Sequence, residues 1–97
     1  MLKAQERAFL SGLSTNLKDL VFIGKEGLTD NVIKQIDDNL YAHELIKVKV
    51  QKSQSDDLVG LSQQIAEASK CEVVCIRGSK IILYKVTEKP KFKHLLG

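Results

Sequence analysis

The sequence predicts an α/β protein: a single domain with the element order α-β-α-β-α-β-β, in which a four-stranded mixed sheet packs with three helices. Three observations support this class. A chain of 97 residues folds around one core. Apolar residues recur with helical spacing in three segments, and strand-like segments alternate with those helices before a closing pair. The alternation implies parallel crossovers, and the closing pair must be antiparallel.

The first two elements are a helix and an apolar strand. The helix carries an apolar stripe of Leu2, Phe9, Leu10 and Leu13. It ends before the polar residues 14–16. The continuous apolar run at 20–23 predicts a strand that is buried on both faces. On this interpretation the rings of Phe9 and Phe22 belong to the core.

The next two elements are a helix and an alternating strand. Thr29 can cap the helix, and Asp30 suits the positive end of its dipole. The apolar stripe of this helix is Leu28, Val32, Ile33, Ile36 and Leu40. Residues 44–51 then alternate with a period of two, which places apolar side chains on one face and Lys47 and Lys49 on the other.

A third helix and a hairpin complete the domain. Ser55 and the two aspartates after it favour a helix start, and the apolar stripe continues to about Ser69. Two strands follow, at 71–77 and 80–86. The Gly78-Ser79 pair between them fits a two-residue hairpin with glycine first.

The net charge of +3 is unevenly distributed. Residues 1–43 carry five basic and six acidic side chains, whereas residues 44–97 carry ten and six. We therefore expect a domain at 1–86 and a basic C-terminal tail at 87–97. A basic region favours a polyanionic partner, and a merely solvated surface is the alternative.

Several classes of function lack support in the sequence. No apolar run approaches the roughly 20 residues that span a bilayer, and the N-terminus lacks the apolar region of a secretory signal. Cys71 and Cys75, expected on one strand face with Val73, suggest buried thiols in a reducing, cytoplasmic setting. Neither His43 nor His94 completes a metal motif with them.

No serine or cysteine has a nucleophile context, and no carboxylates pair convincingly. We therefore expect a monomeric protein that is not an enzyme. We expect no catalytic or metal site, no cofactor, no small-molecule substrate and no membrane partner.

The most informative local motif is the loop Gly24-Lys25-Glu26-Gly27 between a strand and a helix. Glycines let a ligand's backbone come close, and the first amides of a helix point outward, which suits a phosphate. Lys25 adds a positive charge, and Glu26 opposes it. A simple tight turn is the alternative interpretation of this motif.

Basic side chains recur beside this loop, on the alternating strand and the hairpin. They are Lys47, Lys49, Arg77, Lys80 and Lys85. A solvent-facing sheet surface is the alternative interpretation. Aromatic residues are scarce, which argues against a base-stacking sheet platform and for recognition of backbone and shape. Tyr41 and Tyr84 could either stack on bases or pack in the fold.

With these elements in place, the chain resembles the YhbY-type family of RNA-binding proteins, whose domain is called CRM (chloroplast RNA splicing and ribosome maturation). The resemblance covers about residues 2–86. Its most specific parts are the loop and helix start at 24–29, the strand at 43–50 and the hairpin at 77–85.

The resemblance implies a fold similar to the C-terminal domain of translation initiation factor three. It also implies binding of ribosomal RNA and association with large-subunit precursors. The glycine loop is compared, in its local chemistry and not its topology, with the KH-domain loop that clamps nucleic-acid backbone. Carried onto this chain, the RNA-binding residues would be Gly24, Lys25, Glu26, Gly27, Leu28, Thr29, Lys47, Lys49, Arg77, Lys80 and Lys85. A protein-interaction module that docks on a ribosomal or other protein without touching RNA is the alternative.

Overall fold

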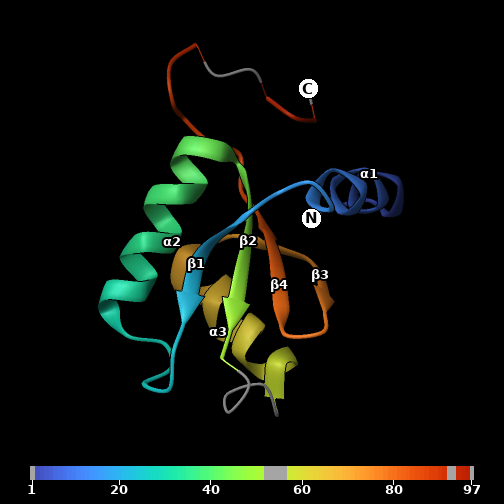
Figure 1. The fold of residues 1–97 in the computed structure, drawn as a ribbon. Coiled ribbons are helices and arrows are strands. Elements are labelled where there is room, and N and C mark those ends of the chain that lie inside the picture. The colour runs from blue at the N-terminus through green and yellow to red at the C-terminus, as the bar shows by residue number, and fades with distance from the viewer. Residues whose placement is uncertain (1, 52–56, 92–93, 97) are drawn as a thin grey trace.

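A computed structural model describes residues 2–51, 57–91 and 94–96, and its elements follow the expected order (Figure 1). They are α1 (Ala4–Ser14), β1 (Asp19–Ile23), α2 (Asp30–His43), β2 (Leu45–Val50), α3 (Leu58–Ser69), β3 (Glu72–Arg77) and β4 (Lys80–Tyr84). The predicted α-β-α-β-α-β-β order is confirmed. Among the described residues, no helix is long and apolar enough to cross a bilayer.

The four strands form one mixed sheet in the order β1-β2-β4-β3. β1 and β2 run parallel because α2 crosses over between them, while β4 is antiparallel to both β2 and β3. Arg77 and Lys80 face each other across the Gly78-Ser79 turn. Gly78 has a φ of 57°, in the left-handed region that favours glycine. The mixed sheet and its closing hairpin are confirmed.

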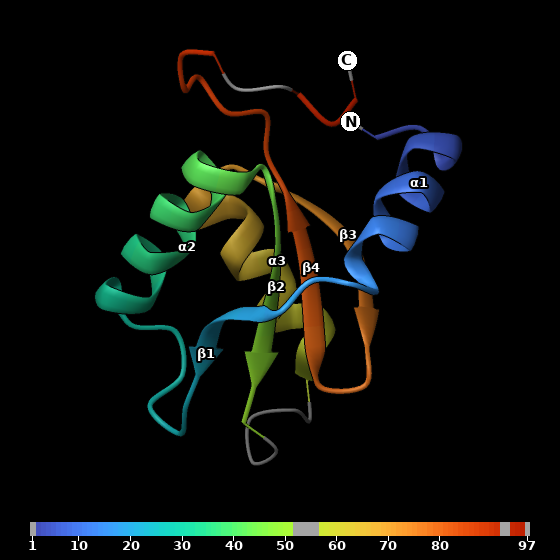
Figure 2. The ribbon, with the colours of Figure 1, turned by 45° about the horizontal axis from the view of Figure 1, so that its top comes forward.

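The helices cover opposite faces of the sheet (Figures 1 and 2). α2 and α3 pack on one face, where Ile36, Leu40 and Ile65 join the main core with apolar side chains of the strands. α1 packs on the other face, where Leu10 joins a smaller cluster with residues of β2, β3 and β4. Among the described residues, none from β1 belongs to this second cluster, so the α1 side of β1 is left uncovered.

The expectation that β1 is buried on both faces is wrong. Val21 and Ile23 are buried, but Leu20 is 40% exposed and Phe22 is 55% exposed. β1 is an edge strand on the side of the sheet away from β3, and α1 packs over the other strands. Only the α2 side of β1 is therefore covered, and Phe22 lies outside the core.

The expectation that Phe9 belongs to the core is also wrong, because its ring is 51% exposed. α1 turns Leu10 and Arg7 toward the sheet instead, and a neighbouring residue on a helix points about 100° away. Arg7 Nη1 donates hydrogen bonds to the carbonyl oxygens of Val73 and Val74, the second at 3.0 Å. A polar contact with β3 thus fixes the orientation of α1.

The carbonyls that Arg7 binds lie at an irregularity of β3 that also separates the two cysteines. The pairing with β4 shifts between Val73 and Cys75, which leaves Val74 as an extra residue. Beyond such an insertion, each side chain points to the opposite side of the sheet from the one that regular alternation would give. Cys71 therefore lies in the main core, whereas Cys75 packs against the α1-side cluster. The expectation that both thiols share a face is wrong.

Two helices begin at residues that satisfy their free amides. Thr29 Oγ1 accepts a hydrogen bond from Val32 N at 3.2 Å, as expected for the cap of α2. Asp57 Oδ1 accepts from Gly60 N at 3.0 Å and caps α3. The other two residues of the predicted α3 start, Ser55 and Asp56, lie outside the described residues.

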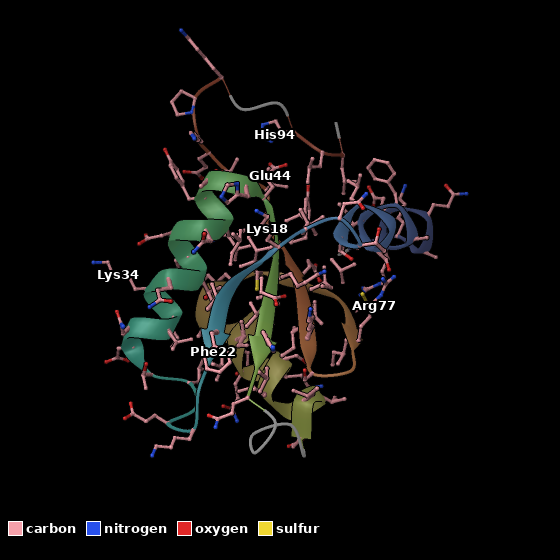
Figure 3. All side chains as sticks on the ribbon, in the orientation of Figure 1. Lys18, Phe22, Lys34, Glu44, Arg77 and His94 are labelled. Carbon is pink, nitrogen blue, oxygen red and sulfur yellow. The ribbon has the colours of Figure 1, made fainter. Side chains whose placement is uncertain are left out.

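The described part of the C-terminal segment folds back onto a buried glutamate (Figure 3). Glu44 is 0% exposed; it accepts hydrogen bonds from Thr87 N at 2.9 Å and Leu95 N at 3.0 Å, and lies 2.5 Å from His94 Nδ1. Burial works to raise the pKa of Glu44, but these contacts together lower it below the ordinary value of 4.5. The segment after β4 therefore makes specific contacts with the domain.

Candidate nucleic-acid interface

The loop between β1 and α2 is a tight turn whose two glycines have different roles. Gly27 N donates to Gly24 O at 3.0 Å, and Gly27 has a φ of 74°, which other residues adopt only with strain. A Cβ on Gly24 would meet the Phe22 ring at 3.6 Å, an ordinary contact. Lys25 and Glu26 are both exposed at the tip, so their charges cancel formally. The loop's capacity for anions thus comes from its backbone.

The start of α2 supplies that backbone. The Thr29 hydroxyl accepts the capping hydrogen bond of α2, and the apolar side chain of Leu28 packs against the main core. Neither side chain is therefore the main hydrogen-bond donor that a ligand would meet here. Val32 N donates to the Thr29 cap, whereas the amides before it in the first turn have no intrahelical acceptor and carry the positive end of the dipole. Asp30, in the first turn, adds a negative charge there. Phosphate binding at this point would depend on amides rather than on the Leu28 or Thr29 side chains.

Four of the five predicted basic side chains lie on one surface. We call the uncovered part of the α1 side of the sheet the open face. It consists of Leu20, Phe22, Lys47, Lys49, Arg77 and Lys80. Phe22, Lys49, Lys80 and Arg77 are successive partners across all four strands. Strands lie about 4.8 Å apart, so this row is about 14 Å long.

The open face adjoins the glycine loop. Figures 1 and 2 show the β1–α2 loop and the β3–β4 hairpin at the same end of the sheet, away from α1 and the C-terminal segment. Figure 3 shows Phe22 on β1 near that end. The structure therefore brings together the loop and the cations that the sequence pattern placed on separate elements.

The open face carries four cations, and Asp19 is a carboxylate of the described residues that pairs with one of them. Asp19 Oδ1 lies 3.4 Å from Lys80 Nζ. The Arg77 guanidinium donates to Ser11 Oγ of α1, which holds it at the margin of the face. Lys49 is exposed and Lys47 is half-buried. The surface therefore keeps an excess of positive charge, which suits a row of phosphates.

Lys85 is not part of this surface. Its Nζ donates to Ser69 O at 3.1 Å, at the end of α3, and its backbone N donates to Glu44 O at 2.9 Å. It also lines a cavity of about 400 Å³ with Asp37 and Asp38 of α2. Lys85 thus serves the packing of α3 and lies in an acidic neighbourhood.

Sequence reasoning missed Phe22 as a surface residue and left two tyrosines undecided. Tyr84 is 4% exposed and packs in the α1-side cluster, whereas Tyr41 is 51% exposed on α2. The apolar run at 20–23 contains no polar alternation that could have signalled an open side. The exposure of Phe22 follows only from the edge position of β1.

The Cys71 thiol lies away from the open face, in the main core. Burial raises the pKa of the Cys71 thiol to about 11, which keeps it protonated near neutral pH. Within the described ranges, no three His, Cys, Asp or Glu side chains gather as a metal site. In the described part of the chain, this surface thus consists of cations, backbone amides, the Phe22 ring, Leu20 and the carboxylate of Asp19.

The chain is similar to proteins of one known family. The profile of the CRS1 / YhbY (CRM) domain matches residues 2–85. The Bacillus subtilis protein named "Probable RNA-binding protein YqeI" is 34% identical over 91 residues, with 94% of this chain and 95% of that protein covered. A Haemophilus influenzae protein named "RNA-binding protein" is 33% identical over 92 residues, covering 95% and 93%.

A solved structure supports the same conclusion. The solution structure of hypothetical protein SAV1595 from Staphylococcus aureus superposes with a TM-score of 0.81 and is 38% identical, covering 94% of this chain and 95% of that one. Fold and open face define a small α/β domain with a cationic sheet surface. The chain belongs to the CRS1 / YhbY (CRM) domain family, and the resemblance noted in the sequence is confirmed.

Proposed function

We propose that this chain binds RNA through the open face and the glycine loop. The observation that carries the proposal is the row of Lys49, Lys80 and Arg77 across the sheet, beside the N-terminus of α2. Phosphates dominate the affinity of most nucleic-acid complexes, and basic side chains with helix-start amides are their usual ligands. The family membership and the names of the relatives support the same partner.

Each part of the surface has a role in this proposal. Gly24 lets an RNA backbone approach the loop, and Gly27 gives the turn its shape. The amides after the loop, with Lys25 at its tip, hold a phosphate. The negative charge of Glu26 lowers the affinity of the loop for that phosphate. Lys47 extends the cationic row along β2.

The proposed RNA is ribosomal RNA in precursors of the large subunit. This finer assignment rests on the resemblance to the YhbY-type family. In this role the chain acts by binding alone in the cytoplasm, as a factor in ribosome assembly, without catalysis or cofactor. Docking on a ribosomal protein is the competing role, and the two differ in whether RNA holds the chain in place.

In-cell crosslinking followed by sequencing of the attached RNA tests the assignment. Enrichment at one helix of large-subunit ribosomal RNA is the expected result, and a flat profile would contradict it. Nuclease treatment of isolated large-subunit precursors should release the chain. If the chain stays bound after the RNA is digested, a protein contact holds it and the proposal is wrong.

A further inference from the structure

The ring of Phe22 is the largest apolar group of the open face, which also holds four cations and Leu20, and 55% of the residue is exposed. Isolated exposed apolar residues are common and need no explanation. Phe9 and Tyr41 are exposed to a similar degree, at 51% each. What distinguishes Phe22 is therefore its surroundings rather than its exposure.

Those surroundings place the ring between two candidate phosphate sites. On one side, Phe22 is the direct strand partner of Lys49, which begins the cationic row. On the other side, Phe22 Cε2 lies 3.6 Å from where a Cβ of Gly24 would be, so the ring rests against the start of the glycine loop. The ring is thus adjacent both to the start of the glycine loop and to the first lysine of the row.

We propose that Phe22 is a stacking platform for one unpaired RNA base, whose flanking phosphates are held by the glycine loop and by Lys49. The inference rests on the proposed RNA-binding function and adds that the bound RNA is unpaired where it contacts Phe22. A nucleotide offers a flat base next to a charged phosphate, and the face offers a flat ring next to a cation. Paired bases inside an A-form helix are stacked on both faces, so the interior of a duplex cannot present that surface.

The chemistry of the ring sets what is recognised. Phenylalanine has no hydrogen-bonding group, so it accepts any base that is unstacked. The site would then select the unpaired state rather than a sequence. The cations beside the ring favour a polyanion over an apolar protein side chain as its occupant, although the carboxylate of Asp19 offsets part of the charge of Lys80.

A fluorescence experiment tests stacking directly, because the chain contains no tryptophan. Phe22→Trp introduces a single reporter on the open face. A 16-nucleotide unstructured RNA should quench its emission, and a 16-base-pair blunt RNA duplex should not. Tyr41→Trp is the matched control, since Tyr41 is similarly exposed but lies on α2 beside Asp37 and Asp38; neither RNA should quench it.

Affinity measurements separate stacking from other roles. Base–aromatic stacking is worth about 1–3 kcal/mol per base, so Phe22→Ala should weaken binding of the single strand by roughly 5- to 150-fold. Phe22→Leu keeps the apolar bulk without the ring and should weaken it nearly as much. If Phe22→Leu binds like the wild type, the contact is merely apolar and the inference is wrong.

The outcomes also separate this inference from the function on which it rests. Wild-type protein that binds RNA with an affinity that Phe22→Ala does not change would overturn stacking and leave RNA binding intact. Wild-type protein that binds neither RNA would overturn both. A Phe22→Ala protein that keeps its RNA affinity but no longer binds large-subunit precursors would identify the ring as a protein contact.

Discussion

Replacing the buried Glu44 with glutamine should destabilise the domain more than the same substitution at an exposed glutamate. Its carboxylate is buried and accepts hydrogen bonds from Thr87 N and Leu95 N, with His94 Nδ1 2.5 Å away. Glutamine has one acceptor oxygen and one NH₂ group, so at least one of these donors would face another donor. A buried donor left without an acceptor costs about 1–3 kcal/mol, and hydrogen bonds to charged groups contribute about 1.5–3 kcal/mol each. We expect a loss of roughly 2–4 kcal/mol.

For a domain of this size, about 1 kcal/mol shifts the unfolding midpoint by roughly 4–8 °C, so Glu44→Gln should lower Tm by about 10–30 °C. Thermal unfolding followed by circular dichroism measures this. The exposed Glu88→Gln variant is the control and should change stability by less than about 0.5 kcal/mol. A Glu44→Gln protein that melts within about 2 °C of the wild type would refute this account of the carboxylate.

The same carboxylate predicts a pH dependence. The pKa of Glu44 is lower in the folded protein than its ordinary value of 4.5. Its stabilising effect is therefore present above pH 4.5 and is lost as the pH falls through the lowered folded-state value. The difference in stability between wild type and Glu44→Gln should narrow in acid. A difference that stays constant down to pH 3 would be inconsistent with this assignment.

Three further predictions concern single residues. Gly24→Ala should keep the stability of the wild type, because its Cβ makes only ordinary contacts, yet it should weaken RNA binding by blocking the approach of the RNA backbone. Gly27→Ala should weaken RNA binding and also lower the free energy of unfolding by about 1–2 kcal/mol, since the φ of Gly27 is positive. Chemical denaturation and RNA titration of both variants distinguish the two effects. Lys85→Gln should leave RNA affinity unchanged in an electrophoretic mobility assay, since Lys85 binds the end of α3; a loss as large as that of an open-face lysine would contradict its placement. Cys71 should resist alkylation at pH 8 until the protein unfolds, as mass spectrometry can follow; rapid labelling of the folded protein would contradict its burial.

The element order could be predicted from the sequence because each element carries its own periodicity. The alternation around Lys47 and Lys49 placed β2 correctly, and glycine at 78 placed the hairpin. The errors arose where burial depends on neighbours distant in the chain. A fully apolar run such as 20–23 reads as buried on both sides, and only the position of α1 over the other strands leaves Phe22 exposed.

Two further features depend on tertiary contacts that no local pattern encodes. The extra residue at Val74 reverses the facing of Cys75, and counting residues along a regular strand cannot detect such an insertion. Lys85 looks like part of the basic hairpin, but it lies beyond the end of β4 and reaches α3. Charge along the sequence therefore overestimated the cationic surface by one residue and omitted its aromatic member.

Whether the open face holds RNA is tested by the salt dependence of RNA affinity, compared between the Lys49→Gln and Lys34→Gln variants. Lys49 is the first cation of the row, between Phe22 and Lys80, whereas Lys34 lies on α2 and points away from the sheet in Figure 3. On single-stranded RNA each phosphate contact contributes a slope of roughly −0.7 in a plot of log affinity against log salt, so about five contacts give roughly −3.5.

Lys49→Gln should make that slope shallower by about 0.7 and weaken binding about fivefold at 0.1 M salt. Lys34→Gln should change neither quantity. Equal effects of the two substitutions would show that charge acts without regard to position, and the claim that the open face holds RNA would be contradicted.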